Sequence, residues 1–344
     1  MGKYLGSSLI LLFLLFFLAW LWAEPGAERE LPLVQESAKD SEPEPPVGEE
    51  EPAASAGTLD SASSLRLLSG GTVREMDMET YLMGVVRAEM PASFAPEALK
   101  AQAVAARTYT YYKMANGGSA SHPEADACDD INCCKAYMDA ATAAANWGEQ
   151  TADYEEKIRA AVQQTDGQCI LYEGQPVLAV FHSSSAGETR DAQEVWSSAL
   201  PYLRSVQSPE TADTVPNYHS TASFTAQELK TLLQAAFPAA ELTGRCSDWF
   251  TNIRQQPNGF VTELSVGGIS VRGNALRTAL GLRSACFTMA FEGDTVTFSV
   301  TGYGHGVGMS QYGANVLAAD GMTWQEILAW YYTDTTVGTY LPPK

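Results

Sequence analysis

The stretch that decides the fold is Tyr81–Lys113, YLMGVVRAEMPASFAPEALKAQAVAARTYTYYK. It begins as an apolar segment, turns after Glu89, and continues from Pro96 as an alanine-rich helix, because proline fits the first turn of a helix. The turn places the Glu89 carboxylate where strand-like structure, or a short helix over Tyr81–Arg87, gives way to a loop. Lys100 and Arg107 lie two helical turns apart and therefore share nearly one face. This pattern indicates either an acid/base site or a surface ion pair.

The charge balance excludes one class of function. The chain has 41 acidic residues against 21 Lys and Arg, for a net charge of −20, whereas a nucleic-acid binder needs a basic surface. The excess is uneven, since residues 24–60 hold eleven acids and two bases. The rest of the chain is only mildly acidic, so the sign of a ligand's charge stays open.

Residues 1–23 predict a transmembrane anchor. Tyr4–Ala23 is twenty residues without a charge, and twenty helical residues just span the hydrocarbon core of a bilayer. A signal peptide is the alternative, but bulky Leu21 stands where cleavage after Ala23 needs a small residue. Lys3 before the span and the acidic stretch after it predict that the rest of the chain lies outside the cytoplasmic membrane.

Residues 24–62 predict a disordered tether, because this acidic, proline-rich stretch buries too little apolar surface to offset the entropy of ordering. Residues 63–344 form the folded part. Its helices and hairpins alternate without a βαβ rhythm, which predicts an α+β fold. We expect hairpins at 64–78, 169–181 and 286–300, strands within 250–271, and helices at 225–237, 273–282 and 323–332.

A cysteine-rich loop predicts either a metal site or a disulfide. His122, Cys128 and Cys134 are spaced six and six, with Cys133 as a spare. One histidine and two thiolates are a ligand set that zinc accepts, although the spacing is not that of a standard finger. The alternative is a disulfide from Cys128 to Cys134 or Cys133, with His122 simply exposed.

Two further loops carry candidate substrate contacts. HSSSAGETR, residues 182–190, follows a predicted strand, as site loops often do. A Ser–His nucleophile there is an alternative, but no G-x-S-x-G elbow is present. In TGYGHGVGMSQYG, residues 301–313, glycines surround His305, so the backbone approaches something closely or adopts positive φ. We assign substrate contacts to His182, Ser183, His305 and Gln311, and to Lys100 on the helix.

Three stretches resemble one family. EMPASFAPEALKAQAVAARTY, FHSSSAGETRDAQEVW with PYLRSV, and GHGVGMSQYGA with WQEILAWYY are similar to the stage II sporulation protein D family of spore-forming bacteria. The resemblance covers residues 62–340 or so. It implies mixed helices and β-hairpins around one glycan-binding cleft. It also implies a lytic transglycosylase that cleaves the MurNAc–GlcNAc bond of peptidoglycan and leaves 1,6-anhydro-MurNAc ends.

The resemblance also implies roles for individual residues. The family's catalytic glutamate falls on Glu89, and other functionally important positions fall on Arg107, Tyr202 and Arg204. Relatives commonly have lysine at the last position, so the charge is kept there but not the shape. Clostridial-type members hold zinc with one histidine and two cysteines, which match His122, Cys128 and Cys134, although members without these ligands exist.

The implied setting is septal wall remodelling and engulfment during sporulation. The family's substrate is glycan strands that the amidase stage II sporulation protein P has stripped of stem peptides, and stage II sporulation protein M is a further partner. The resemblance therefore places the catalytic domain between the mother-cell and forespore membranes.

The chemistry agrees with a single acid. No second carboxylate stands out beside Glu89, whereas a glycoside hydrolase normally needs two. A transglycosylase manages with one residue that acts as acid and then as base, provided that it is desolvated enough to stay protonated near neutral pH. Direct pairing with Arg107 would oppose this, so we expect Arg107 and Arg204 to hold the substrate instead. The alternatives are a non-enzymatic glycan-binding activator of an amidase and a zinc-dependent cell-wall hydrolase.

Overall fold

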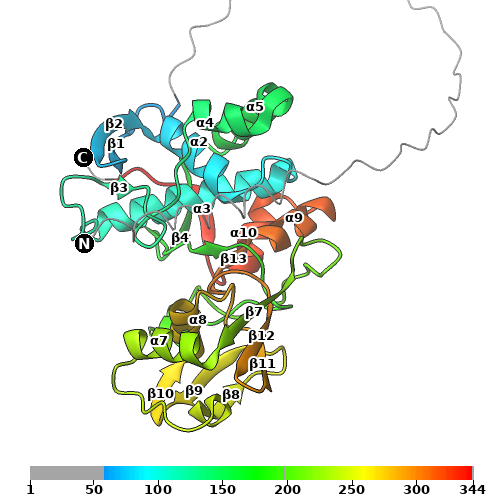
Figure 1. Ribbon diagram of the computed structural model, residues 1–344. Helices are drawn as coiled ribbons and strands as arrows, with labels where there is room; N and C mark the ends of the chain where they lie inside the picture. Colours follow the sequence, from blue (N-terminus) through cyan, green and yellow to red (C-terminus); the bar gives the residue numbers. More distant parts are fainter. Residues whose placement is uncertain (1–57, 197, 343–344) are drawn as a thin grey trace, which may run out of the picture. The chain divides into compact units, whose positions relative to one another are not determined.

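A computed structural model describes residues 58–196 and 198–342 (Figure 1). The predicted anchor and the predicted tether up to residue 57 lie outside these residues. No helix within the described ranges is long and apolar enough to cross a membrane. Helices and mostly antiparallel strands are both present, which confirms the α+β class.

The first predicted hairpin is confirmed. Strands β1 (Ser64–Ser69) and β2 (Thr72–Asp77) pair in antiparallel register from Ser64 opposite Asp77 to Ser69 opposite Thr72. Gly70 and Gly71 form the turn with φ of +57° and +76°, which glycine adopts without a steric penalty. The short strand β3 (Ala127–Cys128) joins β1 in parallel and brings the cysteine-rich loop to this sheet.

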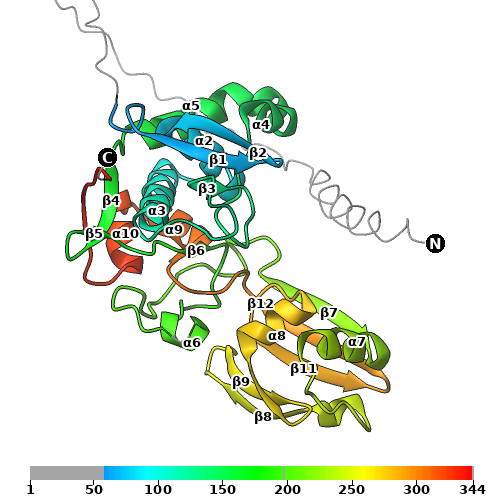
Figure 2. The ribbon, with the colours of Figure 1, turned by 90° about the vertical axis from the view of Figure 1, so that its left-hand side faces the viewer.

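Two helices form the centre of the fold. Helix α2 (Met78–Glu89) starts at Asp77, whose carboxylate accepts from the Thr80 N–H, so of the strand-like segment and the short helix expected before Glu89, the helix is found. Helix α3 (Pro96–Ala115) has its proline in the first turn, as predicted. It packs against α2 and against several later elements, and most of its residues are buried (Figure 2).

The first hydrophobic core surrounds α3. After the cysteine-rich loop, the chain adds helical segments and short strands, and residues beyond 302 return to the same core. These elements are α4 (Ala140–Trp147), η2 (Gly148–Gln150), α5 (Thr151–Gln163), β4 (Gln168–Tyr172), β5 (Gln175–Pro176), β6 (Phe181–His182), α6 (Ala192–Trp196), β13 (Met309–Ser310), α9 (Gln311–Ala319), α10 (Trp324–Tyr331) and β14 (Thr336–Thr339). Strand β6 pairs in parallel with β13, and β4 pairs with both β5 and β14.

A second hydrophobic core forms within residues 219–301. Two three-stranded antiparallel sheets and two helices enclose it. They are β7 (His219–Thr225), α7 (Ala226–Ala236), η3 (Cys246–Trp249), β8 (Phe250–Gln255), β9 (Val261–Val266), β10 (Ile269–Arg272), α8 (Gly273–Leu280), β11 (Phe287–Glu292) and β12 (Thr295–Thr301). The segment begins and ends at adjacent points, because the Gly302 N–H donates to the Tyr218 carbonyl at 2.8 Å. The predicted helices and hairpin of this region are confirmed.

A buried ion pair fixes the start of the folded chain. The guanidinium of Arg107 on α3 is 0% exposed, and its Nε donates to both carboxylate oxygens of Asp60 at 2.9 and 3.0 Å. Its Nη1 donates to the Gln168 carbonyl at 3.0 Å. The folded part therefore begins before residue 63, inside the predicted tether. The substrate contact that we expected of Arg107 does not fit this enclosed position.

Replacement of Arg107 by alanine should destabilise the protein strongly. It leaves the Asp60 carboxylate buried without a partner, which typically costs about 3–5 kcal/mol. Urea unfolding followed by circular dichroism measures the loss. The matched control is Arg204→Ala, which truncates a half-exposed side chain and should stay within about 0.5 kcal/mol of wild type. Equal stability of the two variants would contradict a structural role for Arg107.

Candidate functional site

The Glu89 carboxylate lies at the C-terminal end of α2. Its Oε1 accepts from the Ala136 N–H at 3.0 Å. Gln311, the first residue of α9, donates through Nε2 to the Glu89 backbone carbonyl at 2.8 Å. The structure thus brings together two of the predicted site residues, and Gln311 touches the end of the helix that carries Glu89.

The surroundings of Glu89 favour its protonated form. Burial raises the pKa of Glu89, and this effect outweighs the charge of Lys135 and the hydrogen bond from Ala136, both of which lower it. The position at the C-terminal end of a helix acts in the same direction as burial, because that end carries partial negative charge. The result is a carboxyl group suited to donate a proton closer to neutral pH than an exposed glutamate could.

Lys135 is the residue of this site that the sequence did not reveal. Its side chain is buried, with Nζ 3.7 Å from the centroid of the Phe181 ring and 4.1 Å from that of Tyr109. Burial lowers the pKa of Lys135 to about 8, although the charge of Glu89 opposes the shift. A lysine in a polar loop carries no sequence signal of burial, and only its position directly after Cys134 hinted at a constrained backbone.

Residues 134–138, here called the 134–138 segment, run along α2. Besides the Ala136 hydrogen bond, the Met138 N–H donates to the Gly84 carbonyl at 3.0 Å. The Tyr137 ring lies against Gly84, so closely that a Cβ at Gly84 would stand 2.1 Å from the ring. The same ring stacks on Tyr81, with the centroids 6.3 Å apart. Gly84 therefore makes room for the segment that donates to Glu89.

Gly84→Ala should destabilise the protein by about 1–3 kcal/mol, because the added methyl group meets the Tyr137 ring. The predicted destabilisation is informative because replacement of glycine by alanine on an exposed part of a helix normally stabilises a protein, by up to about 1 kcal/mol. Chemical unfolding of Gly84→Ala alone and in a Tyr137→Ala background tests the cause. In that background the alanine should be neutral or stabilising, and an unchanged penalty would exclude the ring as its source.

The predicted metal ligands lie together. The ligand atoms of His122, Cys128, Cys133 and Cys134 are all within 4.8 Å of one another. All these cysteines are free thiols, and His122 is 2% exposed, so neither the disulfide nor the exposed histidine of the alternative reading is found. His122 Nδ1 is 3.1 Å from the Ala125 carbonyl, which leaves Nε2 toward the thiols. This donor set fits a zinc ion.

The two loops with candidate substrate contacts pack on each other. His182 Nδ1 donates to the Val307 carbonyl at 3.2 Å, and Nε2 accepts from Ser185 Oγ at 2.7 Å. Burial lowers the pKa of His182 to about 4, so it is neutral at physiological pH. Gly304 has φ +118°, and a Cβ there would stand 2.6 Å from the Cβ of His182. The close approach predicted from the glycines is thus an approach of one loop to the other.

His305 packs against aromatic rings of the neighbouring loop and helix. Its ring centroid lies 5.7 Å from that of His182 and 5.0 Å from that of Trp196. Burial lowers the pKa of His305 well below its usual value, and the charges of His182 and Lys135 act in the same direction. The charge of Lys135 therefore acts on the pKa of both His305 and Glu89. Ser183 acts through its backbone carbonyl, which accepts from the Tyr312 N–H at 3.0 Å.

The remaining predicted contacts lie in other environments. Lys100 Nζ pairs with Glu97 of its own helix at 2.7 Å. Tyr202 is 7% exposed, and its hydroxyl accepts from the Leu178 N–H at 3.2 Å. Arg204 is exposed, and its Nη1 lies 3.8 Å from the carboxylate of Asp191. Of Lys100, Tyr202 and Arg204, Arg204 is the residue whose exposed side chain is open to a ligand.

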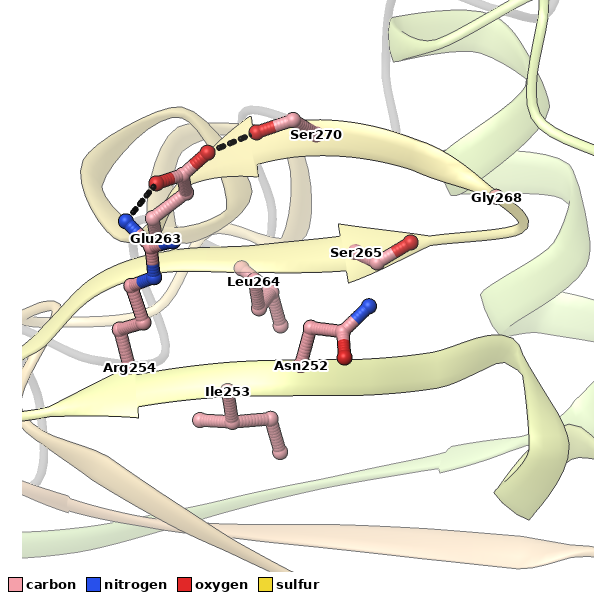
Figure 3. Close-up of a pocket in the computed structure, with 8 residues that line it drawn as sticks. All are labelled: Asn252, Ile253, Arg254, Glu263, Leu264, Ser265, Gly268 and Ser270. Carbon is pink, nitrogen blue, oxygen red and sulfur yellow. Dashed lines mark hydrogen bonds and ion pairs between the residues drawn. The ribbon is translucent and has the colours of Figure 1, made fainter.

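A separate hollow of about 490 Å³ lies on the sheet of β8, β9 and β10 (Figure 3). Glu263 bridges Arg254 and Ser270 there, and the Arg254 side chain is 77% exposed. None of the residues assigned from the sequence lines this hollow. Around Glu89, burial shifts the pKa values of both the carboxyl group and the amine of Lys135, and such shifts are common where proton transfer occurs.

Comparison with known proteins shows the family of this chain. The family model described as "Stage II sporulation protein" matches residues 69–172, a range that includes Glu89 and the His122–Cys134 cluster that could hold a metal ion. The stage II sporulation protein D of Bacillus subtilis (strain 168) is 38% identical over 266 residues, which cover 77% of this chain and 76% of that protein. The chain belongs to the stage II sporulation protein D family.

Other relatives place this family member in a wider group. The stage II sporulation protein D of Bacillus amyloliquefaciens is 38% identical over 265 residues, 77% of this chain and 75% of the relative. A protein named amidase enhancer from Bacillus subtilis (strain 168) is 31% identical over 311 residues, 75% of this chain but 40% of that protein. Sporulation and the cell wall are thus the setting of the family.

Glu89→Gln should make this family member more stable at neutral pH. The pKa of Glu89 is higher in the folded than in the unfolded chain, so wild-type stability falls as pH rises from the unfolded value through the folded one. Glutamine keeps the acceptor for Ala136 without the buried charge. Thermal unfolding between pH 4 and pH 8 should show the gain growing with pH.

The matched control for this measurement is Glu228→Gln. Thr225 donates two hydrogen bonds to the Glu228 carboxylate and lowers the pKa of Glu228. The wild type should therefore gain stability over this variant as pH rises, which is the opposite sign. A Glu89→Gln profile that parallels that of Glu228→Gln would contradict the raised pKa.

Proposed function

We propose that this chain is a lytic transglycosylase that cleaves the MurNAc–GlcNAc bond of peptidoglycan, with Glu89 as acid and then base. The observation that carries the proposal is one carboxyl group whose pKa is raised by burial and whose position is fixed by the Ala136 N–H at 3.0 Å. A single such group suffices for an intramolecular transfer, whereas a hydrolase normally uses two carboxylates.

The reaction would proceed in two proton transfers. Protonated Glu89 donates to the glycosidic oxygen as the bond to C1 of MurNAc breaks, and the GlcNAc end leaves as an alcohol. The Glu89 carboxylate then takes the proton of the C6 hydroxyl as its oxygen bonds to C1, which gives the 1,6-anhydro ring. The carboxyl group ends the cycle protonated, so no water is consumed. The Ala136 N–H holds the carboxyl group in place for both steps, and Gln311 holds the backbone carbonyl of Glu89.

Other residues of the chain supply substrate contacts in this proposal. Trp196 is 37% exposed and lies beside His305, so its ring can stack on a sugar face. Arg204 is open to the lactyl carboxylate of MurNAc. The charge of Lys135 acts on the pKa of both Glu89 and His305, and at Glu89 it favours the carboxylate form that follows proton donation. Lys100, Arg107 and Tyr202 are left out because their polar groups already have partners.

The metal has a supporting role in this proposal. Zinc, when bound by His122 and the cysteines, supplies fixed backbone geometry to the loop that precedes Lys135. The hydrogen bond from His122 Nδ1 to the Ala125 carbonyl sets the orientation of the imidazole ring for this role.

The proposal includes the cellular setting. The anchor at 1–23 would hold the catalytic part outside the cytoplasm, in the space between the mother-cell and forespore membranes. Strands stripped of their peptides by stage II sporulation protein P would be the substrate, and stage II sporulation protein M would complete the assembly. The similarity to stage II sporulation protein D of two Bacillus species supports this setting.

One other function has a specific observation in its favour. The relative named amidase enhancer raises the alternative of a non-enzymatic module that binds glycan and activates an amidase. A zinc-dependent hydrolase is the third candidate, and it requires a metal with an open coordination position.

Mass spectrometry of products from peptide-free glycan strands tests the proposal. The full chain should release fragments ending in 1,6-anhydro-MurNAc, and Glu89→Gln should slow this release by about 10²–10⁴-fold, because general acid–base catalysis is lost. Binding of Glu89→Gln to the same strands should persist. An amidase activator would show no anhydro product and full activity of Glu89→Gln toward its partner, and a zinc hydrolase would give products without the anhydro ring.

A further inference from the structure

Cys133 occupies a position equivalent to that of Cys134. The distance from His122 Nε2 is 3.3 Å to Cys133 Sγ and 3.4 Å to Cys134 Sγ, and the two sulfurs are 3.8 Å apart. Sequence spacing alone favoured Cys134 and left Cys133 as a spare. The structure gives no reason to prefer one thiol over the other.

These separations match the edges of a tetrahedron around a zinc ion. Bonds of roughly 2.3 Å to sulfur and roughly 2.0 Å to nitrogen, at tetrahedral angles, place two sulfurs about 3.8 Å apart and a sulfur and a nitrogen about 3.5 Å apart. All four ligand atoms lie within 4.8 Å of one another. Cys133 Sγ therefore lies as close to His122 Nε2 as an edge of such a tetrahedron requires.

The surroundings of the cluster also point to a metal. The Ala125 carbonyl accepts from His122 Nδ1 at 3.1 Å, so Nε2 carries its lone pair toward the thiols. Ser119 Oγ lies 3.2 Å from Cys133 Sγ, where its hydroxyl can donate to a thiolate. Outer hydrogen bonds of this kind orient the ligands of metal sites.

We propose that Cys133 is the fourth ligand of a closed metal site formed with His122, Cys128 and Cys134. A site with four protein ligands has no open position for water or substrate, which is the mark of a structural zinc site rather than a catalytic one. The metal then ties β3, which carries Cys128, to the start of the 134–138 segment. Because Ala136 of that segment donates to Glu89, the metal positions the donor of the candidate acid without touching the reacting atoms.

Cobalt substitution counts the thiolates. The full chain is loaded with Co²⁺ in place of its metal, and the thiolate-to-cobalt charge-transfer absorption is measured along with the visible bands of tetrahedral Co²⁺. Cys133→Ser should lose about one third of the charge-transfer intensity, since one thiolate of three is removed. Chelator competition should show at least about tenfold weaker metal binding. Ile131→Ala is the matched control, because that neighbouring side chain is 71% exposed, and it should change neither readout.

A second variant separates loss of a ligand from loss of the fold. Cys133→Asp keeps a ligand but not a thiolate, so it should lose the same third of the charge-transfer intensity while keeping the tetrahedral visible spectrum. Full intensity and wild-type affinity in Cys133→Ser would overturn the proposal in favour of three protein ligands. If the metal-free protein were lighter than its expected mass by two hydrogen atoms, a disulfide would be present and the proposal would be overturned. Neither readout depends on glycan cleavage, so the proposal stands or falls independently of the proposed function.

Discussion

The hydrogen bond from the Ala136 N–H to the Glu89 carboxylate is the contact on which the candidate site depends. It joins the end of the central helix α2 to a segment whose position comes from elsewhere: from the cysteine cluster on one side and from the packing of Tyr137 on Gly84 on the other. One backbone donor is enough to fix a carboxyl group without stabilising its charge so much that the proton is lost. The balance between burial and this single donor sets the chemistry of Glu89.

Local signals in the sequence predicted most of the fold. The Gly70–Gly71 turn, Pro96 at the start of α3 and the capping box from Thr225 to Glu228 all act within a few residues, so the sequence displays them directly. The end of α2 was harder to predict. Its apolar residues are buried on nearly every side, which hides the helical period and left both a strand-like segment and a short helix open before Glu89, of which the helix is found.

The candidate site was predictable where chemistry is concentrated in a motif and not where it depends on distant packing. Glu89, Gln311 and the cysteine cluster stand in distinctive patterns, and the structure brings them together or close to one another. Lys135 has no pattern of its own. Arg107 was assigned to the substrate from the family resemblance. Its actual partner, Asp60, lies 47 residues upstream in an acidic stretch that has the composition of a tether, so spacing did not reveal the pair. Burial of a charge is a property of the whole fold, so neither environment could be derived from spacing.

The second core has a consequence for how the fold can diverge. Residues 219–301 leave the first core at Tyr218 and return at Gly302, two points joined by a hydrogen bond. The two ends of the segment are therefore held together whatever its length, while Phe260 and Ala285 of the segment pack in the first core. Its main anchors to the rest are side chains near residues 256–260, including the Asn258 bond to Glu188 at 2.9 Å. The segment has the geometry of an interchangeable module, which evolution can enlarge, trim or replace without moving Glu89.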